Sequence, residues 1–225
     1  MSDALLEAIQ SRDVDRVAAL LAAGADPNEL GKTRSGRGNG LPPLEAAVDE
    51  LEPSEAIGPY PPVPAGPIDS VVLLLRHGAR ATGWGTCNNE DPLLDAVQMN
   101  HIEAVRLLLA AGANPNVRDH MGDSPLRLCA EKGYVEVARL LLRCGATKTI
   151  DEWGGDRPMT ALGLAACDLQ VDMVKLLLAY GADPQARDVD DGTPLDYLEL
   201  VGSPEDPAAQ ERLREIRRLL GDPSA

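Results

Sequence analysis

Phenylalanine is absent from this chain of 225 residues, and aromatic residues make up only 3% of it. Large globular cores are usually built around aromatic side chains, so this composition favours a core of leucine, valine and alanine. No apolar run reaches the length of a membrane span, and the first residues show neither a basic segment nor a cleavage pattern. We therefore expect a soluble, cytoplasmic protein.

Cysteine and histidine are also scarce. The four cysteines have no metal-ligand spacing, which favours reduced, largely structural thiols. None of the three histidines has a catalytic partner at a recognisable spacing, and the usual hydrolase, metalloprotease and nucleotide-binding motifs are missing. The acidic run at residues 188–192 resembles the start of a calcium loop but lacks the glutamate that completes one. We predict no enzymatic activity, no catalytic residue, no cofactor and no metal.

Basic residues are outnumbered, 21 against 36 acidic ones, which gives a formal net charge of −15. Such a charge repels nucleic acids and anionic membranes and attracts a basic protein by electrostatic steering. The sequence thus predicts a basic protein partner, no nucleic acid and no membrane. The alternative is that the acidity only keeps the protein soluble.

What the chain does contain is a repeat. The dipeptide Gly-Ala follows an apolar block five times, and the intervals between its glycines are 54, 34, 33 and 36 residues. These intervals indicate a unit of 33 residues with insertions. A second marker, usually Pro-Leu, opens a short apolar segment about twenty residues before most of these dipeptides. The glycines concerned are Gly24, Gly78, Gly112, Gly145 and Gly181.

One unit shows how the residues specify helices. Pro125 suits the first turn of a helix, because its fixed φ and missing N–H cost nothing there. Gly133 is expected to end that first helix, and the apolar stripe of residues 135–142 predicts a second. Gly145 is expected to end the second helix in a left-handed conformation. Neither helix can bury its stripe alone, so the units must stack.

Residues 122–146 resemble the ankyrin repeat, and the resemblance extends over nearly the whole chain. It implies an all-α fold, an α-solenoid of stacked helix-turn-helix units with hairpin-like loops, which we expect to form a single domain over residues 1–225. It also implies a non-catalytic module for protein–protein interaction. The expected units span about 2–30, 42–80, 91–117, 124–147, 160–186 and 193–220.

The chain departs from the family in its signature histidine and in its insertions. The histidine that ends the family's four-residue signature is replaced at all five positions where the signature recurs, so we expect fewer hydrogen bonds between repeats. A basic, glycine-rich loop occupies residues 31–40, and a proline-rich insertion occupies about 52–66, within the second unit. We expect Tyr60 to anchor that insertion on the stack. The insertion also satisfies a polyproline ligand pattern. The replacements are Glu45, Leu94, Arg127, Gly163 and Asp196.

The two ends of the chain look like capping units. Leu5, Leu6 and Ile9 supply the apolar face of the first helix. At the other end we expect Ser203 to be the N-cap of the last helix, with residues 204–206 in its first turn. Polar outer faces at both ends are what a stack of repeats needs to stay soluble.

The resemblance implies that a partner binds to a concave face lined by the first helices and to the loop tips. We expect this face to be predominantly acidic. Two exposed tryptophans either pack on adjacent loops or act as binding anchors. We expect a monomer that binds a protein; an immunity-type inhibitor of an effector or toxin, and an adaptor that docks through the proline-rich insertion, are the alternatives. The predicted partner-binding residues are Asp49, Glu50, Trp84, Gln98, Met99, His120, Met121, Asp123, Glu131, Lys132, Trp153, Asp168, Asp190 and Asp191.

Overall fold

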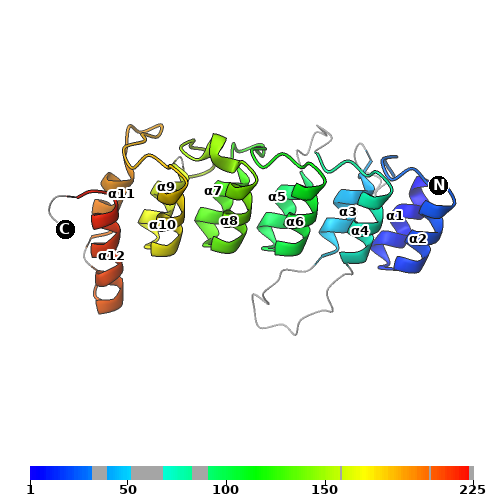
Figure 1. The fold of residues 1–225 in the computed structure, drawn as a ribbon, viewed down its shortest axis with the longest axis horizontal. Helices are drawn as coiled ribbons and strands as arrows, with labels where there is room; N and C mark the ends of the chain where they lie inside the picture. Colours follow the sequence, from blue (N-terminus) through cyan, green and yellow to red (C-terminus); the bar gives the residue numbers. More distant parts are fainter. Residues whose placement is uncertain (32–39, 52–67, 83–90, 158, 203, 223–225) are drawn as a thin grey trace. The chain divides into compact units, whose positions relative to one another are not determined.

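The computed structural model describes residues 1–31, 40–51, 68–82, 91–157, 159–202 and 204–222. These residues form twelve α-helices and one 3-10 helix, and they contain isolated β-bridges but no strand (Figure 1). None of the described helices is both long enough and apolar enough to cross a membrane. The helices are α1 (Ser2–Gln10), α2 (Val14–Ala22), α3 (Pro43–Asp49), α4 (Ile68–Arg76), α5 (Pro92–Gln98), α6 (Ile102–Ala110), α7 (Pro125–Lys132), α8 (Val135–Arg143), η1 (Ala146–Thr149), α9 (Ala161–Cys167), α10 (Val171–Ala179), α11 (Pro194–Leu200) and α12 (Pro207–Leu219).

The contacts divide the chain into two compact units, Met1–Asn114 and Pro115–Ala225. In unit 1, the hairpins α1/α2, α3/α4 and α5/α6 stack so that first helices touch first helices and second helices touch second helices. Unit 2 repeats this arrangement with α7/α8, α9/α10 and α11/α12. The predicted all-α fold of stacked helical hairpins is confirmed within each unit.

The fourth hairpin forms as its residues predict. The Ser124 side chain accepts a hydrogen bond from the N–H of Arg127, and Pro125 occupies the first turn of α7. Gly133 ends α7 with φ of 76°, and Gly145 follows α8 with φ of 98°. Left-handed backbone of this kind is inexpensive only for glycine, which explains why a glycine marks the end of each second helix.

Small and aliphatic side chains fill the core of both units. Ala, Val and Leu residues with little or no exposure make up most of it, and α9 alone buries six of its seven residues. Cys129 belongs to this core, and burial raises the pKa of its thiol, so the structural interpretation holds for this residue. Cys144, by contrast, is exposed at the end of α8.

The last helix begins later than the sequence predicted. Its N-cap is Asp206, whose carboxylate accepts hydrogen bonds from the N–H groups of Ala208 and Ala209, and Pro207 is the first helical residue. The prediction of residues 204–206 as its first turn was therefore wrong. An aspartate directly before proline provides both the cap and the fixed φ, and this combination outweighs the earlier Ser-Pro pair.

Three of the sequence predictions fall outside the described residues. They concern Trp84, the proline-rich insertion with Tyr60, and most of the basic loop at 31–40. At the edge of that loop, Gly31 and Leu41 form an isolated antiparallel bridge, in which each N–H donates to the other residue's carbonyl at 3.3 and 3.0 Å.

Candidate functional site

The C-terminal ends of the first helices display one group of the predicted residues, which we call the first-helix surface. In unit 1 it comprises the ends of α3 and α5, two helices that pack against each other. In unit 2 it comprises the ends of α7 and α9, which are also packed together. All of its members are exposed or half-buried. They are Asp49, Glu50, Gln98 and Met99 in unit 1, and Glu131, Lys132 and Asp168 in unit 2.

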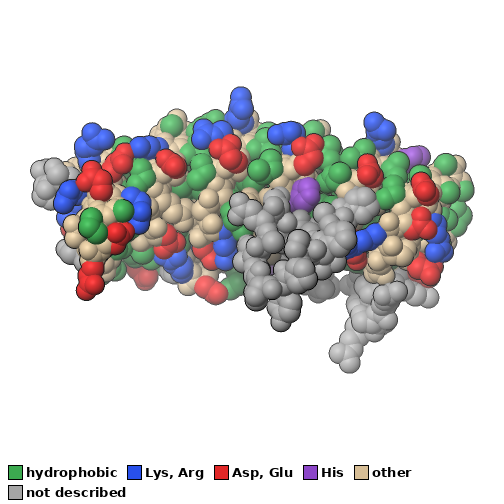
Figure 2. Space-filling model, turned by 90° about the horizontal axis from the view of Figure 1, so that it is seen from below, with side chains coloured by type: hydrophobic (Ala, Val, Ile, Leu, Met, Phe, Trp, Pro, Cys, Tyr) green, Lys and Arg blue, Asp and Glu red, His purple; other side chains and the backbone are tan. Residues whose placement is uncertain are grey.

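Ion pairs reduce the negative charge of the first-helix surface. Glu50 lies 3.2 Å from Nε of Arg12 on the preceding hairpin, and Nζ of Lys132 lies 3.1 Å from Glu131. Exposed pairs of this type contribute only about 0–1 kcal/mol to stability. Each of them nevertheless places a positive charge beside a carboxylate and so lowers the local negative charge of the surface. Figure 2 likewise shows acidic and basic side chains interspersed over the described part of the face that it presents.

The Arg157–Asp168 pair joins a loop of unit 2 to the end of α9. Two N–O contacts of 3.1 and 3.3 Å make it bidentate, and the hydrogen bond that Arg157 donates to the Asp168 carboxylate raises the pKa of the guanidinium. Arg157 thus pairs with Asp168, one of the acidic residues predicted for the first-helix surface, and offsets its negative charge. The surface is mixed in charge where the sequence alone indicated an acidic one.

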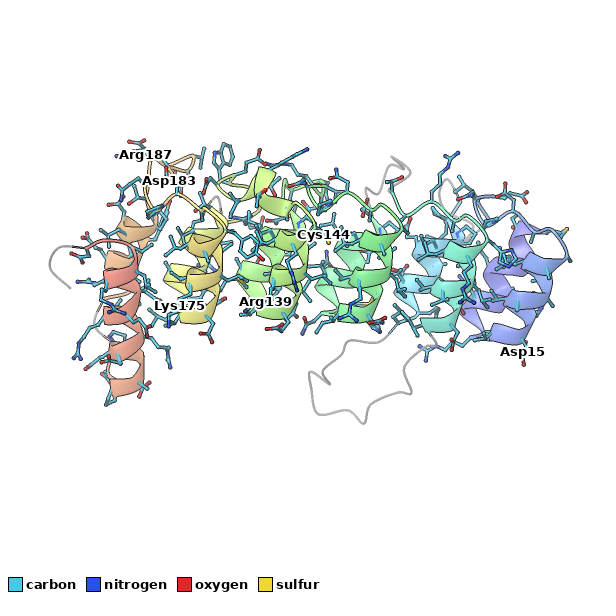
Figure 3. All side chains as sticks on the ribbon, in the orientation of Figure 1. Asp15, Arg139, Cys144, Lys175, Asp183 and Arg187 are labelled. Carbon is cyan, nitrogen blue, oxygen red and sulfur yellow. The ribbon has the colours of Figure 1, made fainter. Side chains whose placement is uncertain are left out.

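The loop tips of unit 2 carry a second group of residues. Three successive loops each expose an apolar side chain: Met121 (43% exposed), Trp153 (47%) and Val189 (53%). His120, Asp190 and Asp191 are exposed on the same loops. These tips lie at the end of the hairpins where Figure 3 labels Arg187, whereas its labelled Arg139 and Lys175 project from the second helices α8 and α10.

The loops at 118–123 and 152–157 are fastened to each other. Arg118 donates hydrogen bonds to the carbonyl of Gly122 at 2.8 Å and of Trp153 at 3.4 Å, and it also pairs with Glu152. The N–H of Gly155 donates to the carbonyl of Met121 at 3.0 Å. A Cβ on Gly154 would meet the Gly122 carbonyl oxygen at 2.3 Å, so this close approach requires glycine.

Beneath these loops lies a buried ion pair that sequence reasoning missed. Arg127, only 2% exposed, places its Nε 2.5 Å from Asp123 and donates to the carbonyls of Arg157, at 2.9 Å, and Met159. The sequence had suggested that Asp123 presents its charge to a partner. Asp123 is instead buried, and its carboxylate faces Arg127. Arg127 stands at the family's histidine position, and here it ties the repeat to the next loop.

A second connection between repeats runs through the loops that follow the second helices. In unit 1, Asn28 donates to the carbonyl of Gly78 and accepts from the N–H of Arg80, each at 2.9 Å. In unit 2, Asn116 donates to the carbonyl of Gly145 at 2.9 Å, and Asp151 accepts from the N–H of Asp183 at 2.8 Å. The loss of the signature histidine therefore leaves these inter-repeat bonds in place.

Nothing in the described part of the chain assembles three or more His, Cys, Asp or Glu side chains in a way that could hold a metal ion. His101 has a structural role, because its Nδ1 accepts the N–H of Ala104 at 3.1 Å as the N-cap of α6. The residues that do come together in unit 2 belong to the end of α7, the end of α9 and the paired loops. This arrangement displays side chains on rigid helices and braced loops, which suits binding rather than chemistry.

Comparison with protein families identifies the repeats. A model for three copies of ankyrin repeats matches residues 64–152, and a model for a single ankyrin repeat matches residues 159–189. Together these matches span more than half of the chain. The chain belongs to the ankyrin repeat family. No curated protein matches the sequence.

Solved ankyrin repeat structures are similar over almost the full length. The human ASB11 ankyrin repeat domain is 26% identical, with a TM-score of 0.66 over 94% of this chain and 81% of the other. The ankyrin repeat protein EF0377 is 27% identical, with a TM-score of 0.71 over 99% and 98%. An ankyrin repeat domain from Acinetobacter baumannii AYE, ABAYE2397, shares the fold at 23% identity, with a TM-score of 0.75 over 96% and 95%.

Membership of this family indicates the general class of function. Ankyrin repeats generally serve as protein–protein interaction modules and as non-catalytic scaffolds for binding. The resemblance seen in the sequence is confirmed, and so is the fold class that it implied.

Proposed function

We propose that this ankyrin repeat protein is a non-catalytic module that binds a basic protein partner through its first-helix surface and loop tips. The observation that carries the proposal is the separation of two tasks within each hairpin. Leucine, valine and alanine hold the stack together, while the residues at helix ends and loop tips differ from repeat to repeat and remain exposed. Such a scaffold presents a surface that can be specific without altering the core.

The charge of the partner follows from the excess of carboxylates that remains after local pairing. The chain has 36 acidic and 21 basic residues, so pairing every base would still leave a negative surplus. On the loop tips this surplus includes Asp156 and Asp190, both exposed. A partner with a basic surface would associate faster in the electrostatic field of these carboxylates. Added salt would screen that field and remove the gain in association rate.

The test is affinity capture from the native host with matched variants, followed by mass spectrometry. The first-helix surface variant is Gln98→Arg with Met99→Arg, and the control on the second helix of the same hairpin is Glu103→Arg with Arg106→Glu. We expect wild type and control to retain the same basic protein and the first-helix variant to lose it. Raising salt from about 0.1 to about 1 M should elute that protein.

The outcome of the capture also decides between the alternative roles. A single partner held at about nanomolar affinity favours an inhibitor, whereas several weaker partners favour an adaptor. Retention of every captured protein by the first-helix variant, or its loss from the control instead, contradicts the proposed surface. A turnover of substrate abolished by one histidine or aspartate substitution would contradict the non-catalytic assignment.

A further inference from the structure

We propose that Met121 and Trp153 form an anchoring platform that receives an apolar side chain from a basic segment of the protein partner. This inference rests on the proposed function and adds the chemistry of the partner to it. The name anchoring platform refers below to these two side chains together with the loops 118–123 and 152–157 that carry them.

The two side chains belong to loops that are bonded directly to each other. The Met121 carbonyl accepts the N–H of Gly155 at 3.0 Å, and the Trp153 carbonyl accepts a hydrogen bond from Arg118 of the neighbouring loop. An isolated antiparallel bridge also pairs Trp153 with Thr160, at the start of α9. The backbone on which both apolar side chains stand is thus fixed in the absence of a partner.

Despite this fixed backbone, neither side chain is covered by the rest of the protein. Trp153 is 47% exposed and Met121 is 43% exposed, whereas Leu126 and Leu162, in the first turns of α7 and α9, are buried completely. Large apolar side chains left exposed on neighbouring loops mark interaction sites, and tryptophan is enriched among the residues that dominate binding energy. Methionine adapts its shape to different apolar partners.

Positioning of the anchoring platform depends on two arginines of different burial. Arg127 holds the far end of the second loop from below through the carbonyls of Arg157 and Met159. Arg118 lies at the surface and links Gly122, Glu152 and Trp153. A rigid apolar anchor loses little entropy on binding, so this bracing favours slow dissociation of the complex.

The charges around the anchoring platform identify the kind of segment that would fit. Besides Asp123, which is buried and paired with Arg127, the two loops carry three carboxylates, Asp119, Glu152 and Asp156, against two guanidinium groups, Arg118 and Arg157. Both guanidinium groups already face a carboxylate, namely Glu152 for Arg118 and Asp168 for Arg157. The surplus is negative, and it is complementary to lysine or arginine residues beside an apolar anchor.

Peptide display tests this inference even while the partner is unidentified. The full chain with Trp84→Phe, which leaves Trp153 as its one tryptophan, selects from a library of random peptides. A Met121→Ser, Trp153→Ser double variant removes background binders. We expect the selected peptides to combine an aliphatic or aromatic residue with nearby lysine or arginine. Titration with a synthetic copy should shift the Trp153 emission to shorter wavelength.

Variants then separate anchoring from positioning. Trp153→Ser should weaken binding of the synthetic peptide by about 30-fold, the effect of losing a strong hot spot. Arg118→Gln should leave the unfolding midpoint unchanged, make Trp153 more accessible to acrylamide in the free protein, and raise the dissociation rate. Arg139→Ala, which removes an exposed arginine of α8 paired with Glu136, is the matched control and should change none of these.

Three results would overturn the anchoring platform: no peptide survives the counter-selection, the selected peptides are acidic or lack an apolar residue, or Trp153→Ser binds them as tightly as wild type. Peptides that bind Trp153→Ser but not the Gln98→Arg, Met99→Arg variant would leave the proposed function standing and refute only the platform. Failure to obtain any binder by display and by capture would contradict both.

Discussion

Arg127 illustrates how one residue can take over a role that the family assigns to another. A buried guanidinium is costly unless every donor is engaged, and here it meets one carboxylate and two carbonyl groups of the following loop. Sequence reasoning identified Arg127 as the residue that replaces histidine at this position, but not the bonds that Arg127 makes. Asp123 lies four residues before Arg127, but the two carbonyl acceptors lie 30 and 32 residues after it, and nothing in the local pattern around Arg127 indicates them.

Asp151 offers a test of the bonds between loops. It stands where the other two connections use Asn28 and Asn116, and it accepts the N–H of Asp183. Burial raises the pKa of the Asp151 carboxyl, and the Asp183 carboxylate adds to this rise, although the hydrogen bond opposes it. A carboxyl whose pKa is higher in the folded chain stabilises the fold less as pH rises through that pKa.

We therefore predict that Asp151→Asn raises the free energy of unfolding at pH 7 by about 0.5–1 kcal/mol. The amide keeps the acceptor and gains a donor for the carbonyl of Gly181, just as Asn28 donates to that of Gly78. The gain should shrink as pH falls through the raised pKa of the wild-type carboxyl, because the protonated side chain no longer carries the buried charge. Urea unfolding at several pH values measures this. Asn116→Asp is the reverse control, and a loss of stability in Asp151→Asn at pH 7 would contradict the assignment.

Gly133 allows a test of the left-handed backbone conformation at the turn between the first and second helices. The equivalent turn between first and second helices uses Arg12, Asn100 and Leu169, all with positive φ. A Cβ on Gly133 would make only ordinary contacts with Gln170, the nearest at 3.6 Å, so the cost of substitution is backbone strain alone. We predict that Gly133→Ala lowers the free energy of unfolding by about 1 kcal/mol. Gly133→Asn should cost less, because asparagine adopts this conformation more readily. Equal costs in thermal or urea unfolding would refute this account.

At the scale of helices, the sequence was most informative where one residue type has a single physical use. Proline at a helix start and glycine after a helix end located α7 and α8 correctly, because each residue fixes or permits one backbone conformation. Capping was predicted less well at α12, where Asp206 is the N-cap and Pro207 the first helical residue, three residues later than the cap expected from the sequence. Helix ends depend on such competition, which a local pattern does not resolve.

The last helix, α12, is predicted to be essential for unit 2. It packs against α10 and buries Leu213 and Ile216, while Lys175 of α10 lies 2.6 Å from the Glu215 carboxylate. We expect a chain ending at residue 202 to aggregate or to lose cooperative unfolding, because the apolar face of α10 becomes exposed.

Calorimetry and light scattering measure the effect of this truncation. Lys175→Ala, which removes only the exposed ion pair, serves as the control and should cost at most about 0.5 kcal/mol. A truncated chain that remains monomeric and melts as sharply as the full chain would show that α12 is not a cap.

For the whole molecule, the repeat pattern and the family resemblance predicted the class of fold, whereas the net charge was a weaker guide to the binding surface. The negative net charge is a sum over the chain, but the distribution of that charge depends on which side chains meet. Pairs such as Arg12–Glu50 and Arg157–Asp168 join residues 38 and 11 positions apart and neutralise predicted acidic positions. The exposed Met121 and Trp153 were identified from the sequence, whereas the bonds that bring their loops together required the structure.

The number of folding units is the remaining prediction for the whole chain. The repeats continue without a linker between residues 91 and 147, so we expect the predicted single domain to unfold in one cooperative transition. The two tryptophans allow a direct test, because Trp84 belongs to residues 1–114 and Trp153 to residues 115–225. Trp153→Phe and Trp84→Phe variants should give coincident fluorescence transitions in urea, and both should match circular dichroism.

Comparison of each variant with wild type by circular dichroism controls for any effect of the substitution itself. Midpoints that differ between the two probes would show that the two compact units unfold separately.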